Sequence, residues 1–132
     1  MEPYRRKVRF WDVDAYGHVF NARYFVYFDD ALCDLFEEAG VPFEPGRNGG
    51  LMFVVVHAEC DHRGDAKLGD RLDTTARVRR FGRTSITFDL EVTKHPGGET
   101  VAVGNEVYVV VDAATGEPIP VPDDVRERLA AV

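Results

Sequence analysis

A single helical segment followed almost entirely by strand patterns is the feature that most restricts how this chain can fold. From Ala22 to Ala39 apolar residues recur with the helical period, and Gly40 followed by Pro42 predicts where a helix of about 17 residues ends. The apolar face of this helix is unusually aromatic and consists of Tyr24, Phe25, Phe28, Ala31, Leu32, Leu35, Phe36 and Ala39. Such a face needs a broad sheet to cover.

Most of the remaining chain alternates between apolar and polar residues with the period of a β-strand. The segments "FGR" and "HPGGE" predict hairpin turns between the later strands. The last predicted strand is nearly continuous in apolar residues, which is typical of a central position. The predicted strands are Tyr4–Trp11, Met52–His62, Arg71–Phe81, Ser85–Thr93 and Thr100–Asp112, and Asp123–Ala131 is expected to form a short terminal helix.

The order of strand, long helix and four strands predicts an α+β fold with one helix packed on a mostly antiparallel sheet of about five strands. A chain of 132 residues suits one domain, spanning residues 1–132. One helix covers a face of such a sheet only partly. The remaining apolar strand surface therefore predicts a partner subunit.

The overall charge restricts the possible partners. A formal net charge of −7 argues against a general nucleic-acid binder, because neutralising phosphates requires a basic face. No apolar run approaches the roughly 18 residues that span a bilayer, so no membrane partner is expected. The N-terminus has no apolar signal core behind its charges, which makes a cytoplasmic protein the default expectation.

Basic side chains gather in two short segments. Four of the 16 Lys and Arg residues lie in Tyr4–Arg9 and four lie in Arg77–Arg83. In an acidic protein these clusters predict either a site for a small polyanion or the solvated faces of two strands.

Cys33 and Cys60 form no CxxC pair and have no ligand-spaced histidines, so we expect reduced, packed thiols and no metal site.

The segment "FWDVDAYGHVFNARYFVYFDDA" brings carboxylates and a histidine to the junction between a strand and the helix. Asp12, Asp14 and Gly17 superficially match the start of a calcium-binding EF-hand loop. However, the fifth and twelfth positions would be Tyr16 and Arg23, and a strand precedes the segment where an EF-hand requires a helix. We exclude calcium binding.

Helix capping explains part of this junction and catalysis explains another part. Asn21 stands immediately before the helical period and is a favoured N-cap residue, while Asp12 is explained if it ends the strand and accepts from nearby amides. Asp14 and His18 are left without a role. The first turn of a helix presents unpaired N–H groups that suit an acyl oxygen becoming anionic. Asp14, on the loop before it, is then a candidate nucleophile or general base.

The same segment resembles the opening of the 4-hydroxybenzoyl-CoA thioesterase group of the hotdog-fold superfamily, which reads roughly F-x-D-x-D-x-x-G-H-V-N-N-x-x-Y-x-x-Y. The matching residues are Asp12, Asp14, Gly17, His18, Val19, Asn21, Tyr24 and Tyr27. Phe20 stands where many relatives have asparagine. The similarity extends to "AKLGD", "FGRTS" and the closing "GEPIPVP", and so covers nearly all of the chain.

The resemblance implies a hotdog fold, in which a mostly antiparallel sheet wraps one long central helix, and an acyl-CoA thioesterase that uses no metal or cofactor. Asp14 occupies the place of the family's nucleophile or general base. The backbone N–H of Asn21 occupies the place of the amide that polarises the thioester carbonyl. Gly17 is expected to let the loop approach closely. His18 either orients substrate or water, or braces the loop.

Substrate contacts follow from the resemblance as well. Tyr24 and Tyr27 are candidates for the acyl channel, with core packing as the alternative for Tyr24. Arg83 matches a turn position where some relatives hold the CoA phosphates, for which a guanidinium is well suited, and Thr84 and Ser85 are expected to add hydroxyl contacts. The closing segment lacks the late basic residue that some relatives use. The resemblance also implies a homodimer or homotetramer with active sites at the subunit interface.

Two other functions compete with hydrolysis. A hotdog dehydratase for hydroxyacyl thioesters pairs a histidine with an acid from the central helix, whereas Asp14 before Gly17 and His18 suits hydrolysis better. A non-catalytic acyl-CoA-binding module has no need of Asp14. Release of free thiol from an acyl-CoA separates hydrolysis from both. The sequence does not distinguish an aromatic acyl group from an aliphatic one.

Overall fold

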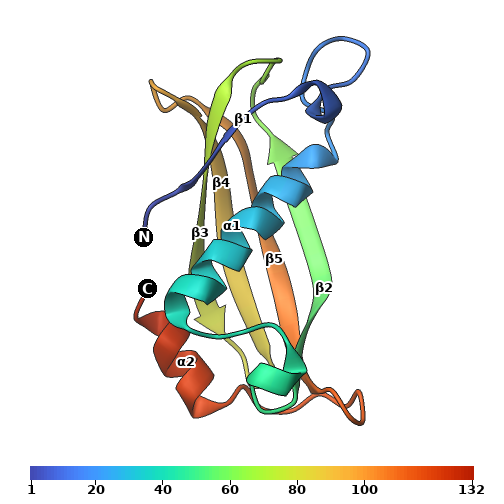
Figure 1. Cartoon of the computed structure of the whole chain (residues 1–132), viewed down its shortest axis with the longest axis vertical. Helices are drawn as coiled ribbons and strands as arrows, with labels where there is room; N and C mark the ends of the chain where they lie inside the picture. Colours follow the sequence, from blue (N-terminus) through green and yellow to red (C-terminus); the bar gives the residue numbers. More distant parts are fainter.

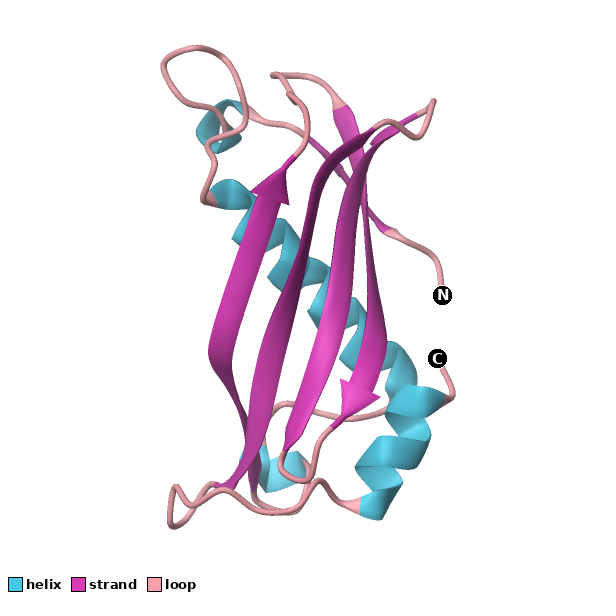
Figure 2. Ribbon diagram, turned by 180° about the vertical axis from the view of Figure 1, so that it is seen from behind, coloured by secondary structure: helices cyan, strands magenta, loops and turns pink.

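In the computed structural model, which describes residues 1–132, one long helix lies across a curled antiparallel sheet (Figures 1 and 2). The sheet has five strands in the order β1-β3-β4-β5-β2. Its strands are β1 (Tyr4–Lys7), β2 (Leu51–His62), β3 (Arg71–Phe81), β4 (Ser85–His95) and β5 (Thr100–Asp112); the helices are α1 (Arg23–Ala39) and α2 (Asp123–Ala130). The predicted fold class and element order are confirmed.

The first strand is shorter than predicted. It ends at Lys7, and Phe10 and Trp11 lie in a 3-10 turn with 81% and 65% of their surfaces exposed. The cause is Asp12, which is fully buried and accepts a 2.8 Å hydrogen bond from the Arg9 amide. This contact turns the chain away from the sheet. The predicted continuation of this strand to Trp11 is therefore wrong.

The ends of α1 agree only partly with the sequence. Gly40 ends the helix in the left-handed conformation with φ 72°, as predicted. The helix begins at Arg23, and the preceding residue is Ala22 rather than Asn21. No side chain caps this end. The prediction of Asn21 as a side-chain N-cap is wrong, because the chain already turns helically at Ala22.

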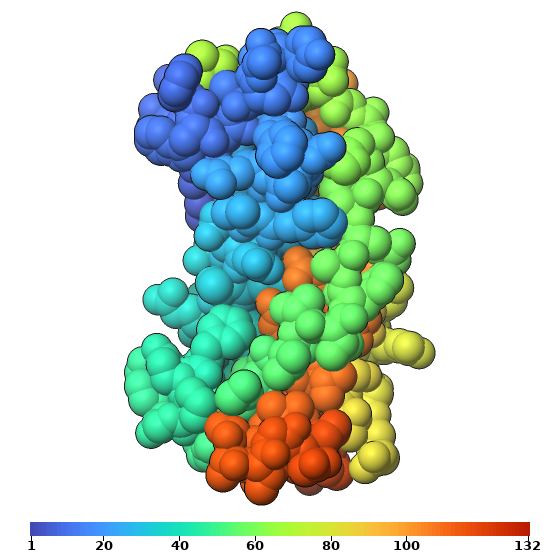
Figure 3. All heavy atoms as spheres, turned by 90° about the vertical axis from the view of Figure 1, so that its right-hand side faces the viewer, coloured from blue at the N-terminus to red at the C-terminus, as the bar shows by residue number.

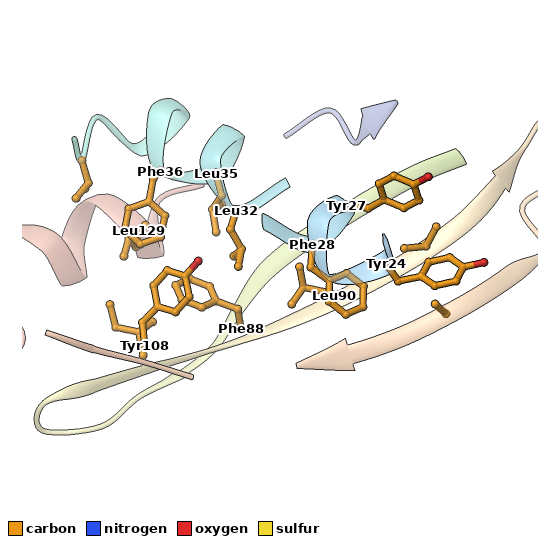
Figure 4. Packing of buried hydrophobic residues seen from close by; sticks show 14 of the residues in the cluster. Tyr24, Tyr27, Phe28, Leu32, Leu35, Phe36, Phe88, Leu90, Tyr108 and Leu129 are labelled. Carbon is orange, nitrogen blue, oxygen red and sulfur yellow. The ribbon is translucent and has the colours of Figure 1, made fainter. Parts of the chain in front are cut away.

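The aromatic face of α1 forms the core with the inner face of the sheet (Figure 4). Phe36 packs against Phe88 of β4 and Tyr108 of β5, with ring centroids 5.8 and 5.9 Å away. Nearer the helix start, Phe28 lies directly over Gly104, where an added Cβ would lie 2.7 Å from the ring. Glycine at this position therefore lets α1 settle closely onto β5.

One edge of the sheet stays uncovered. β2 pairs on one side with β5 and has no strand on its other side. Its Met52, Val54, Val55 and Val56 are all exposed. The predicted apolar strand surface is thus present. No helix is both long and apolar enough to cross a membrane.

Candidate active site

Asp14 lies on a tight hairpin that leads directly into α1. Its N–H donates to the His18 carbonyl at 2.9 Å, and the Phe20 N–H donates to the Asp12 carbonyl at 2.9 Å. Gly17 closes the turn with φ 77°, a conformation that costs a residue with a side chain more than it costs glycine. Nothing in the chain lies within 4 Å of a Cβ added there, so Gly17 serves the turn, and the close approach expected of this loop stays a prediction.

The two oxygens of the Asp14 carboxylate have different surroundings. Its Oδ1 accepts from the Tyr16 N–H at 2.9 Å and from the His18 N–H at 3.3 Å. No hydrogen bond within the chain reaches Oδ2. The side chain is half-buried, so one oxygen fixes its orientation and the other is available to a substrate or to water.

Two backbone amides at the start of α1 are unpaired. The N–H groups of Asn21 and Ala22 donate to no carbonyl and to no side chain, and both residues are exposed. Unpaired amides in the first helical turn carry positive partial charge and suit a developing oxyanion. The hairpin therefore carries an oriented carboxylate and leads directly into unpaired helix-start amides.

His62, at the end of β2, was not predicted to belong to this site. Its Nε2 lies 3.2 Å from the carbonyl oxygen of Asn21 and must donate, because a carbonyl only accepts. Its ring also meets Tyr24 edge to face, with centroids 5.4 Å apart. His62 thereby holds the peptide that joins Asn21 to Ala22. No local motif marks this contact.

The "AKLGD" segment, Ala66–Asp70, braces the hairpin from outside. The Val19 N–H donates to the Ala66 carbonyl at 2.8 Å, and the Leu68 N–H donates to the Gly17 carbonyl at 3.2 Å. The His18 main chain forms a bridge with Lys67, while its ring lies at the surface with Nδ1 3.8 Å from an Asp65 oxygen. The main chain of His18 thus braces the loop, and a role for its ring stays a prediction.

Asp12 has a structural role, in agreement with the sequence expectation. Besides the Arg9 amide, its carboxylate accepts from Arg6 of β1 at 3.1 Å and from Arg23 of α1 at 2.8 Å. Burial disfavours its charge, but the Arg9 amide and the Arg23 and Arg6 guanidiniums outweigh this and hold the pKa of Asp12 below its usual range. Asp12 ties the first strand to the helix start.

The two tyrosines of the motif pack in the core (Figure 4). Tyr24 is 3% exposed, and its ring contacts Tyr27 and His62, so it lies beside the site without opening onto solvent. Tyr27 is 1% exposed beneath the Arg6 guanidinium, which lies 5.5 Å from the ring centroid. A guanidinium covers the Tyr27 ring in this chain, and a role for Tyr27 in an acyl channel stays a prediction.

Arg83, Thr84 and Ser85 lie at the far end of the molecule from Asp14. The Arg83 carbonyl accepts from the Val121 N–H, and Arg126 of α2 bonds the neighbouring Gly82 carbonyl. The same helix α2 contacts the C-terminal end of α1 through Arg128 and Gly40. Because α1 has 17 residues, the turn is about 25 Å from the helix start along the axis. One chain does not bring Arg83 to Asp14.

Most of the clustered arginines are paired with acids. Arg5 pairs with Asp73, Arg6 pairs with Asp12, and both Arg77 and Arg79 pair with Asp89. Arg80 and Arg83 have no acidic partner and remain candidates for binding an anion.

The two cysteines are free thiols as expected, but Cys33 is exposed and not packed, because it lies on the flank of α1 that no strand covers.

Comparisons with known proteins agree with this arrangement. Residues 8–129 match the model of the thioesterase-like superfamily. The long-chain acyl-CoA thioesterase FadM of Escherichia coli (strain K12) is 30% identical over 93% of this chain and 92% of its own length. A crystal structure of a thioesterase from Thermus thermophilus, complexed with coenzyme A and Zn, superimposes with a TM-score of 0.84 at 32% identity, covering 98% of this chain and 92% of that one.

Similarity of the fold extends to proteins whose sequence identity with this chain is low. A 1,4-dihydroxy-2-naphthoyl-CoA thioesterase from Synechocystis is 18% identical, yet its structure superimposes with a TM-score of 0.89 over 99% of this chain and 96% of that one. The superfamily model includes the hairpin with Asp14, the whole of α1 and all of the sheet except β1. With the wrapped central helix, the hairpin and these matches together, the chain belongs to the thioesterase-like superfamily of hotdog proteins.

Proposed function

We propose that this chain hydrolyses acyl-CoA thioesters at the Asp14 hairpin, with the Asn21 amide polarising the thioester carbonyl. Family membership and the acyl-CoA thioesterases among its relatives make the chain a thioester hydrolase. The assignment of the site depends on two features that lie together on one short segment. The oriented Asp14 carboxylate has an unbonded oxygen, and unpaired amides begin the helix that follows.

The chemistry follows from these groups. The Asn21 N–H donates to the thioester oxygen and stabilises the negative charge that forms on it during attack. Asp14 either attacks the carbonyl carbon, giving an anhydride that water then opens, or removes a proton from the water that attacks directly. In both routes the C–S bond breaks and coenzyme A leaves as its thiol. In the direct route water supplies one oxygen of the acid. In the anhydride route Asp14 supplies that oxygen, and water that opens the anhydride at the Asp14 carboxyl carbon replaces it.

The decisive variant is Asp14→Asn, which keeps the shape of the side chain and removes its charge. We expect kcat to fall by at least roughly 10²-fold in a protein with an unchanged unfolding midpoint. Asp61→Asn, an exposed carboxylate change on β2, is the matched control and should retain wild-type turnover. Near-wild-type thiol release by Asp14→Asn would refute the assignment.

Single turnover in isotopically labelled water separates the two chemical routes. An anhydride that water opens at the Asp14 carboxyl carbon leaves labelled oxygen in that carboxyl group, which peptide mass spectrometry detects, and the free acid is then unlabelled. Direct attack by water labels only the free acid. The same reaction, followed by thiol release, excludes a dehydratase or a simple binding module, since neither frees coenzyme A.

We expect the substrate to bind at an interface between two subunits. Four aromatic side chains around the Asp14 hairpin are exposed, a surface that soluble monomers rarely present; they are Phe10, Trp11, Tyr16 and Phe20. The open β2 edge adds a second apolar surface. We therefore propose a homo-oligomer in which a partner covers these surfaces and brings Arg83, Thr84 and Ser85 toward the coenzyme A phosphates.

The relatives do not fix the acyl group. Their names range from a long-chain acyl-CoA thioesterase to 1,4-dihydroxy-2-naphthoyl-CoA hydrolases, one of which, from Synechococcus elongatus, is 23% identical over 96% of this chain. A hydrolysis panel of short, medium, long and aromatic acyl-CoAs would locate the preferred class by kcat/KM.

A further inference from the structure

A furrow runs between α1 and β2, away from the start of the helix. Strand residues paired directly across a sheet point to the same face, so Ala58 and Val55 of β2 share the helix-side face with Glu106 and Tyr108 of β5. Ala58 and Val55 are exposed, since α1 does not cover them. Figure 3 faces this side and shows atoms of β5, in orange, between the helix and the green β2.

The floor of this furrow holds a carboxylic acid. Glu106 is 2% exposed and lies on β5 between Gly104, which supports Phe28, and the core residue Tyr108. The carboxyl group of Asp29, from the exposed flank of α1, lies near enough to act on its charge. Two neighbouring carboxyl groups do not both ionise readily when one of them is buried, so the pair holds one proton and Glu106 is its neutral member.

One oxygen of this pair lacks a partner. Glu106 Oε2 is buried and makes no hydrogen bond. A buried polar atom without a partner destabilises the folded protein, which is a reason to expect that something binds there in the working protein. Burial, reinforced by the nearby Asp29 carboxylate, raises the pKa of Glu106 to about 8, so the neutral form persists at physiological pH.

We propose that Glu106 and Asp29 form a specificity site that accepts a hydroxyl group on the acyl chain of the substrate and rejects a carboxylate. A hydroxyl both donates and accepts, so it can satisfy the unpaired oxygen whichever acid holds the proton. A carboxylate would meet the net negative charge of the pair. This inference rests on the proposed function, since it places the acyl chain in the furrow that leads from Asn21.

The structure also sets the expected distance between the thioester carbonyl and the hydroxyl group of the substrate. Asp29 follows Asn21 by eight residues, which is about 12 Å along a helix axis. An extended chain advances roughly 1.2 Å per single bond, as the three-bond repeat of an extended backbone shows. The hydroxyl is therefore expected about 10 bonds from the thioester carbonyl, as in an ω-hydroxydecanoyl group.

Three acyl-CoAs of equal length test the proposal: decanoyl, ω-hydroxydecanoyl and the mono-thioester of decanedioic acid, which ends in a carboxylate. The wild type should prefer the hydroxylated substrate over decanoyl by about 10-fold in kcat/KM, the effect of one hydrogen bond, and should turn over the carboxylate poorly. The Glu106→Leu variant should instead prefer decanoyl-CoA over ω-hydroxydecanoyl-CoA in kcat/KM. Glu106→Gln should keep the wild-type preference in part and should still turn over the carboxylate poorly, because the amide replaces the neutral acid and Asp29 keeps the negative charge of the pair.

Controls separate specificity from folding and from hydrolysis. Glu127→Gln and Glu127→Leu make the same changes on the exposed face of α2 and should leave all three ratios at wild-type values. Calorimetric binding of the three ligands to Asp14→Asn reads the specificity site without catalysis, so a failure of hydrolysis does not affect it. Equal binding of decanoyl and ω-hydroxydecanoyl ligands would overturn the proposal.

Discussion

Asp12 and Asp14 are only two residues apart, yet the fold gives them different roles. Asp12 is surrounded by donors, the Arg9 amide and two guanidiniums, and no oxygen of it is exposed. Asp14 receives two loop amides on one oxygen only. The number of donors around each carboxylate decides the difference. A saturated, buried carboxylate stabilises the fold, whereas an oriented and unsaturated one can react.

His62 is expected to act as a positioning residue through its bond to the Asn21 carbonyl. His62→Ala should lower kcat by about 10-fold with little change in KM, a smaller loss than removal of an oxyanion donor itself. The physical reason is that the peptide carrying the Ala22 N–H loses its anchor beside the Asn21 amide. Steady-state kinetics with one acyl-CoA substrate measures the effect.

Two further variants distinguish positioning from packing at this residue. His62→Gln should recover most of kcat, because its side-chain amide can donate to the same carbonyl. His57→Ala removes an exposed histidine from the same strand and should have no effect on kcat. If His62→Gln is as impaired as His62→Ala while both fold normally, the hydrogen bond is not what matters.

At the scale of elements, α1 and β5 meet through a carboxyl pair in an otherwise apolar interface. Burial first, and then Asp29, raises the pKa of Glu106 from 4.5 to about 8. A raised pKa means that folding favours the protonated acid. Its contribution to the free energy of unfolding is therefore complete below the unfolded pKa and is lost as the pH rises through about 8.

Glu106→Gln should flatten this pH dependence. As the pH rises from about 4.5 to 8, the wild type should lose stability relative to the variant. In this range unfolding of the wild type releases the proton that Glu106 holds in the folded state, and the variant has no such proton. Urea unfolding midpoints, measured at one protein concentration across that range, provide the comparison, with Glu127→Gln as the control. Parallel profiles for Glu106→Gln and wild type would show that the pair does not share a proton.

At the scale of the whole molecule, the candidate catalytic and phosphate-binding residues lie at opposite ends of one chain. Asp14 is at the start of α1, and Arg83 lies beside its C-terminal end, about 25 Å away along the helix axis. A two-fold partner that pairs antiparallel along the open β2 edge would bring opposite ends together. We therefore expect a dimer or tetramer whose activity disappears on dilution together with its association.

Mixed oligomers test this arrangement directly. Arg83→Ala should mainly raise KM, since phosphate contacts far from the thioester act on ground and transition states alike. Co-refolding Asp14→Asn with Arg83→Glu at equal amounts should restore about a quarter of the sites if each site combines both chains of a symmetric dimer. No recovery in mixed oligomers verified by mass would place both residues in the same chain's site, and a fully active monomer would remove the interface altogether.

The sequence by itself determined the elements and the hairpin. Period and turn residues placed β3 at Arg71–Phe81 and β5 at Thr100–Asp112, and the motif around Asp14 placed the carboxylate beside a helix start. These features depend on residues close together in the chain, where side-chain alternation and glycine conformation act locally.

Only the tertiary structure decided which distant residues meet. His62 bonds to a carbonyl 41 residues away, Glu106 of β5 meets Asp29 of α1, and Arg83 is held at the far end by α2. In the local pattern His62 and Glu106 are ordinary polar positions of strands. Their roles arise because side chains of α1 reach β5 while much of β2 stays exposed, and that placement depends on packing of the whole core, including Phe28 on Gly104, rather than on any one segment.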